Sequence, residues 1–134
     1  AGQRMDQRDL IKLVGDNLGD QLWFLAEDAI NTVKNLIAQN EINCFLRPGV
    51  ANLGNSNANA SDLHYYAEFL EKRYKRGNID TVSKEESLTL CMSNEYKGGI
   101  LSINDIDILC DTIIEHCSDN NFNYKINNPW RTRG

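Results

Sequence analysis

The chain has 134 residues, of which 41% are hydrophobic and 25% charged, and this composition indicates one globular domain with room for a single core. The excess of 19 acidic over 14 basic residues gives a formal net charge of −5, which argues against a surface that binds duplex nucleic acid. No apolar run approaches the roughly 20 residues of a membrane span, and no apolar segment of a secretory signal stands at the N-terminus, so we expect a soluble, cytoplasmic protein.

The first predicted element is a short helix within residues 5–18. Its apolar residues lean to one side, and Asp6 or Asp9 can cap its start with a side-chain oxygen. Gly15 weakens the helix and Gly19 ends it. The chain is therefore expected to begin with two antiparallel helices.

A long helix is predicted over residues 20–40, and we expect the other elements to pack along it. A helix of this length spans roughly 30 Å, which is enough to cross a small domain. Its apolar residues recur every three or four positions and predict one wide buried stripe. The stripe consists of Leu22, Leu25, Ala26, Ala29, Ile30, Val33, Leu36 and Ile37.

After Asn40 the apolar period changes from that of a helix to that of a strand. Apolar Ile42, Cys44 and Leu46 stand at every second position until Pro48-Gly49 interrupts the pattern, which predicts a short strand. The next run, residues 52–61, is NLGNSNANAS. Because Asn, Ser and Gly bond to their own backbone and tolerate unusual dihedral angles, this run predicts a mobile loop.

A second amphipathic helix is predicted over residues 63–76, with Ser61 or Asp62 as its cap and Gly77 at its end. Acidic side chains come early in it and basic side chains late, an order that suits the helix dipole. The basic residues 72–76 therefore favour a solvated helix end, and a phosphate-binding patch is the alternative.

Two further helices and a strand complete the pattern. Residues 83–86 form a capping box that begins a helix ending near Met92, and residues 96–101 predict a turn and a short strand. Residues 102–105 read as a second capping box, which would begin the last helix, over residues 103–117.

The predicted fold class is α+β and mainly helical, with about five helices around the long central helix over 20–40 and two or three short strands. Residues 1–118 form the single globular domain. The tail, residues 119–134, loses its periodicity, and we expect it to stay loose unless Phe122 or Trp130 docks.

The four cysteines, Cys44, Cys91, Cys110 and Cys117, show none of the close spacing of zinc or redox sites. Cys110 and Cys117 would lie about 10 Å apart along the last helix, which is too far for a disulfide. We therefore expect buried free thiols.

Metal and catalytic groupings are not expected. Residues 93–104 and 119–130 imitate a calcium loop, but neither has the bidentate glutamate at the twelfth position. The two histidines, His64 and His116, have no partner fixed by sequence. We expect no catalytic residue, no metal and no cofactor.

The candidate binding site consists of Arg47, Asn55, Asn57, His64 and Tyr65, which lie on or beside the predicted Asn-rich loop. Loops on a rigid scaffold carry function more often than packed helix faces do. These residues would converge into a polar, partly aromatic site for an unidentified small molecule or protein. The alternative is a solvated connection without a ligand.

The runs VGDNLGDQLWFLAEDAINTVKNLI, INCFLRPG and EYKGGIL, preceded by Gly2-Gln3, resemble the segment after the flavin-binding glycine motif in FAD-dependent amine and D-amino-acid oxidases. The resemblance implies two helices that lead into a strand of the substrate domain. The glycine fingerprint and the half that completes the flavin pocket are missing. The favoured function is thus a binding or interaction domain, and the alternative is the substrate-side segment of such an oxidoreductase.

Overall fold

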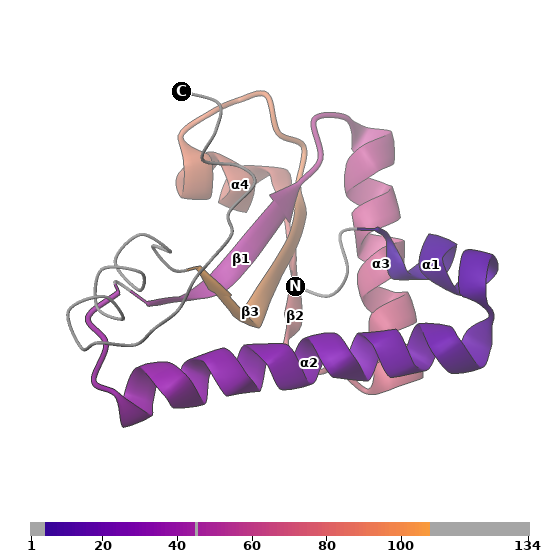
Figure 1. Cartoon of the computed structure of the whole chain (residues 1–134). Coiled ribbons are helices and arrows are strands. Elements are labelled where there is room, and N and C mark those ends of the chain that lie inside the picture. Colours follow the sequence, from indigo (N-terminus) through magenta and orange to yellow (C-terminus); the bar gives the residue numbers. More distant parts are fainter. Residues whose placement is uncertain (1–4, 45, 108–134) are drawn as a thin grey trace, which may run out of the picture.

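The computed structural model describes residues 5–44 and 46–107, which form four helices and three strands (Figure 1). In chain order these are α1 (Gln7–Val14), α2 (Asp16–Gln39), β1 (Arg47–Leu53), α3 (Asn57–Tyr74), β2 (Ile79–Val82), α4 (Lys84–Cys91) and β3 (Gly99–Asp107). The mainly helical α+β class is confirmed. None of the described helices is long and apolar enough to cross a membrane.

The sheet is antiparallel, with β3 between β1 and β2. Ile100 of β3 lies opposite Asn52 on one side and Thr81 on the other. Ile100 and Ser102, two positions apart on β3, are each 4% exposed, so their face of the sheet contributes to the core. Helix α3 packs against the sheet, chiefly against β3 and β2.

Helices α1, α2 and α3 are joined through a polar and aromatic cluster. The ring of Trp23 stacks on that of Tyr74, with centroids 4.6 Å apart. The Gln7 side chain donates to the Gly19 carbonyl and to the Tyr74 hydroxyl, both at 2.8 Å. A side chain at Gly19 would collide with Ile11, so the glycine permits α1 and α2 to approach closely.

The long helix exists, but it begins earlier than predicted, at Asp16, and it is not the centre of the described fold. It runs beneath the sheet and α3 in the view of Figure 1. Within the predicted stripe Ile37 is 8% exposed but Leu25 is 60% exposed, whereas Trp23, outside the stripe, is 5% exposed, so the stripe coincides only in part with the buried face. The stack on Tyr74 and the ion pairs of Arg73 with Asp20 set the rotation of the helix about its axis.

The strand predicted to end at Pro48-Gly49 is wrong, because β1 begins at Arg47 and runs through these two residues. A shift in register between Pro48 and Val50 marks a bulge, and Gly49 adopts a φ of 93° there. A proline is tolerated at this place because β1 is an edge strand in the described sheet and the bulge relieves the ladder.

The mobile loop predicted over 52–61 is also wrong, since only residues 54–56 connect β1 to α3. Ser56 caps α3 by accepting from the Asn59 backbone at 3.1 Å, and the Asn55 side-chain oxygen accepts from the Asn59 side chain at 2.7 Å. The polar side chains that favour a loop thus serve as the cap of a helix.

Two predicted caps are confirmed, whereas the cap predicted at Ser61 or Asp62 is wrong, because α3 begins after Ser56 and both residues lie inside it. Asp6 caps α1, and Ser83 with Glu86 forms the predicted capping box of α4. Helix α3 ends at a left-handed Lys75, two residues before the predicted Gly77.

The last predicted helix is wrong at its start, where residues 103–107 belong to β3. The remainder of that helix and the tail at 119–134 lie outside the described residues.

Candidate functional site

The structure does not bring the five predicted binding residues together. Arg47 begins β1 and Asn55 follows its end, so the seven-residue strand separates them by about 20 Å. Within α3, His64 is half-buried with Nε2 3.4 Å from the Val82 carbonyl oxygen, whereas Tyr65 is 66% exposed. Asn57 is exposed in the first turn of α3, two residues after Asn55.

A depression at the start of α3 is a candidate binding site. It measures about 390 Å³, which is within the usual range for ligand sites, and we call it the α3 depression. A second hollow, beside α4, measures about 90 Å³ and is too small. The lining of the α3 depression consists of Leu53, Gly54, Asn55, Asn59, Asp62, Leu63 and Tyr96.

Gly54 fixes the floor of the α3 depression. A side chain on it would collide with the Ala60 backbone, so only glycine lets the connection lie against α3. Its N–H donates to the Gly98 carbonyl and its carbonyl accepts from the Lys97 N–H, both at 2.8 Å. These two bonds hold Tyr96 beside the first turn of α3, although the two segments lie far apart in the sequence.

Two asparagine amides form one wall. The bond between them uses the Asn59 nitrogen and the Asn55 oxygen, at 2.7 Å. Asn55 therefore keeps its amide donors and Asn59 its amide acceptor, and both residues are exposed. Such a pair matches the donors and acceptors of a peptide backbone.

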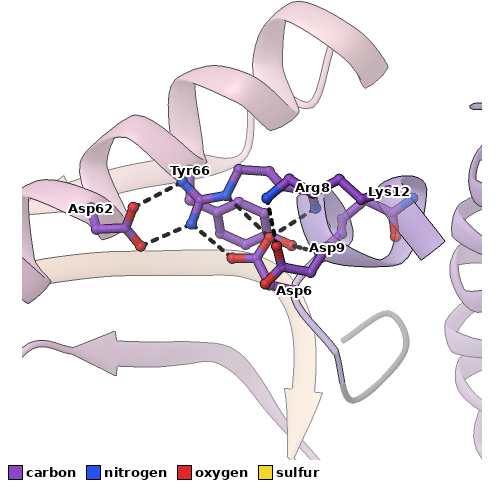
Figure 2. A network of polar contacts seen from close by, with 7 residues as sticks. Asp6, Arg8, Asp9, Lys12, Asp62 and Tyr66 are labelled. Carbon is purple, nitrogen blue, oxygen red and sulfur yellow. Dashed lines mark hydrogen bonds and ion pairs between the residues drawn. The ribbon is translucent and has the colours of Figure 1, made fainter.

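Asp62 of α3 also lines the α3 depression, and Arg8 of α1 holds its carboxylate in place. Figure 2 shows the Arg8 guanidinium between Asp6 and Asp62, and its two terminal nitrogens donate to the two oxygens of Asp62 at 2.9 and 2.8 Å. The same guanidinium lies 4.9 Å from the ring centre of Tyr66. The hydrogen bonds from Arg8 lower the pKa of Asp62 below its ordinary value, so the carboxylate is ionised at neutral pH.

The basic run at 72–76 is engaged within the fold. Arg73 donates to Asp16 and Asp20, Lys72 pairs with Glu68, and Arg76 pairs with Glu27 at 2.9 Å. Arg76 is 8% exposed and lies over the ring of Trp23, so the run is not simply a solvated helix end. Three of the four basic side chains of the run are thus paired with carboxylates, and the alternative of a phosphate-binding patch stays a prediction.

Cys44 is buried, as expected, but Cys91 is exposed and its thiol donates to the Ser87 carbonyl. Cys110, Cys117 and His116 lie outside the described residues. Within residues 5–44 and 46–107, no group of three acidic, histidine or cysteine side chains is arranged to hold a metal ion.

Comparisons of the chain with protein-family models, with curated proteins and with solved structures found no match. The resemblance to FAD-dependent oxidases therefore stays a prediction.

Proposed function

We propose that this protein is an interaction domain that binds an extended peptide segment of a partner protein in the α3 depression. The Asp62 carboxylate carries the proposal, because it faces the same depression as the Asn55 and Asn59 amides and is fixed by two bonds from Arg8. Orientation before binding lowers the entropy that a ligand loses on association.

The chemistry of the walls defines the preferred peptide. An ionised carboxylate favours a lysine or arginine side chain, and the amides can bond to the peptide backbone. Leu53, Leu63 and Tyr96 add apolar surface to the same depression. We therefore expect a basic residue next to an apolar one, in a partner whose charge is opposite to the net −5 of this chain.

The test uses a random-peptide display library selected against the full chain, followed by calorimetric titration of the enriched peptide. We expect enrichment of a basic residue beside an apolar one. Asp62→Asn should weaken binding of that peptide roughly tenfold or more, since a charge-assisted bond is lost.

The matched control is Asp80→Asn, which removes the same charge from an exposed position on β2 and should leave binding unchanged. Thermal melts verify that both variants fold. No enrichment, or equal weakening by the two variants, would refute the proposal.

The second candidate function is the substrate-side segment of a flavin oxidoreductase. It is supported by the element order, because two helices lead into the strand that carries Arg47, Pro48 and Gly49, as the resemblance implies. An absorbance spectrum of the purified chain discriminates between the two functions. Bound yellow cofactor would favour the oxidoreductase segment over the peptide-binding domain.

A further inference from the structure

Helix α2 has a second apolar row beside its buried face. The buried face includes Gly19, Trp23 and Ile37. The second row, which we call the leucine row, is displaced by about a quarter turn around the helix. It consists of Leu18, Leu22, Leu25, Ala29, Thr32 and Leu36.

Most of the leucine row is open to solvent in the described structure. Leu18 is 47% exposed, Leu25 60% and Leu36 50%, and Ala29 and Thr32 are also exposed. Leu22 is half-buried. Three exposed leucines in one row on a single helix typically mark an interaction surface.

The spacing of the leucine row indicates that another helix can pack along it. Its members alternate four and three residues apart, which is the heptad spacing of a coiled-coil seam. The row extends over roughly 27 Å of helix, enough for two and a half heptads. On its solvent side stand Gln21, Asp28 and Asn35, also seven residues apart, so the seam has a polar border that contains one charge.

We infer that the leucine row binds the leucine row of a second copy of this chain, with the two α2 helices antiparallel about a two-fold axis. In that arrangement Leu18 faces Leu36 of the second copy, Leu22 faces Thr32, and Leu25 faces Ala29. Every layer then contains at least one leucine, and two of the three kinds of layer pair a large side chain with a small one.

A parallel pair in register is less suitable. It would place Ala29 on Ala29 and Thr32 on Thr32, which leaves two successive layers without a large apolar side chain. The antiparallel pair is also isologous and closes on itself, as a two-fold dimer requires. The row is therefore complementary to itself in one direction only.

The contact area sets the expected strength. A strip about 27 Å long and about 12 Å wide covers roughly 320 Å² on each copy, about two fifths of a standard interface. The dimer should thus be weak, with a dissociation constant on the order of micromolar. The pairing is independent of the α3 depression and of the proposed peptide ligand.

Sedimentation equilibrium of the full chain from roughly micromolar to millimolar concentration provides the test. We expect a reversible monomer–dimer equilibrium that Leu25→Asp shifts at least tenfold toward monomer. The control is Asn31→Asp, which adds the same charge to an exposed position away from the row. Thr32→Leu should instead strengthen the dimer. Its monomer–dimer equilibrium tests the inference even if Leu25→Asp does not fold.

A chain that stays monomeric throughout overturns the inference. Equal effects of Leu25→Asp and Asn31→Asp would also overturn it.

The antiparallel direction of the two helices is tested by oxidative cross-linking in a Cys91→Ser background, with that background alone as the control. Leu18→Cys should cross-link to Leu36→Cys on mixing, and efficient cross-linking of Leu18→Cys to itself would refute the antiparallel pairing.

Discussion

Trp23 is the residue on which the packing of the helices depends most. Its indole is 5% exposed, it stacks on Tyr74 of α3, and the Arg76 guanidinium lies 5.3 Å from its ring centre. Arg76 is in turn held by Glu27, one turn further along α2. Because the ring of Phe24 also meets Tyr74 edge-on, at 5.9 Å between centroids, aromatic as well as polar contacts join α2 to α3.

Trp23→Ala should lower the free energy of unfolding by about 3–5 kcal/mol, because it removes a large buried ring and leaves a cavity. Leu25→Ala should change it by less than about 0.5 kcal/mol, since that side chain is already solvated. Denaturant titrations of dilute protein measure both values. A larger loss for Leu25 than for Trp23 would mean that α2 is rotated from the orientation described above.

The carboxylate of Asp20 makes stability depend on pH. It accepts from Arg73 Nε and from the Tyr74 hydroxyl, both at 2.7 Å, and these bonds lower its pKa below the ordinary value. A group with a depressed folded pKa adds stability above its unfolded pKa of about 4, and this contribution is lost as the pH falls through the folded pKa.

Asp20→Asn should therefore melt at a lower temperature than the wild type at neutral pH, with the gap narrowing as the solution is made acidic. Melting temperatures measured over that pH range decide the outcome. The control is Asp9→Asn, which removes a carboxylate from an exposed i,i+3 pair with Lys12 and should have little effect. A difference in melting temperature that grows as the pH falls would contradict the lowered pKa of Asp20.

At the scale of elements, two helix starts are predictable from neighbouring residues, whereas the capping box predicted at 102–105 fails because these residues pair within the sheet as part of β3. The caps at Asp6 and at Ser83 with Glu86 are confirmed because each involves residues within one helical turn. Strand β1 was misplaced because its pairing partner is β3, and Asn52 lies opposite Ile100. Local periodicity contains no information about a partner so far along the chain.

The candidate site could be predicted only in part for the same reason, because its residues come from segments that are distant in the sequence. Asn55 was expected at a binding surface, and it does line the α3 depression. From sequence alone, Asp62 is predicted only as a helix cap and Tyr96 only as part of a turn. Arg8 orients Asp62 across 54 positions of sequence, so its role is visible only once α1 and α3 are in contact.

The pairing of β1 with β3 is sensitive to one glycine. A side chain at Gly99 would overlap the Asn52 carbonyl oxygen, whereas one at Gly77 would meet open space. Gly99→Ala should destabilise the protein by roughly 2 kcal/mol or more, and Gly77→Ala by less than about 0.5. Thermal melts of the two variants test this, and equal losses would contradict the close approach of the strands.

At the scale of the whole molecule, α3 connects helices α1 and α2 to the sheet. Its Tyr74 joins α1 and α2, and its His64 lies against β2. Within the described residues, α3 therefore contacts helices α1 and α2 as well as the sheet. Unfolding of α1 and α2, or of the sheet, should therefore expose α3 and destabilise the part that is still folded.

Unfolding should accordingly be a single transition. The fluorescence of Trp23, in a Trp130→Phe background, reports on the helices, and the protection of the buried Cys44 thiol reports on the connection to the sheet. Both probes should give the same denaturant midpoint. Two separated midpoints would show that the parts unfold independently.

The position of β3 has a consequence for the order in which the protein acquires its shape during synthesis. In the described sheet, β1 and β2 do not pair with each other, and each is bonded to β3, the last described element of the chain. A nascent chain that has reached residue 98 can assemble α1, α2 and α3 but has no partner for either edge strand. The ribosome must release β3 from its exit tunnel before any part of the sheet can form.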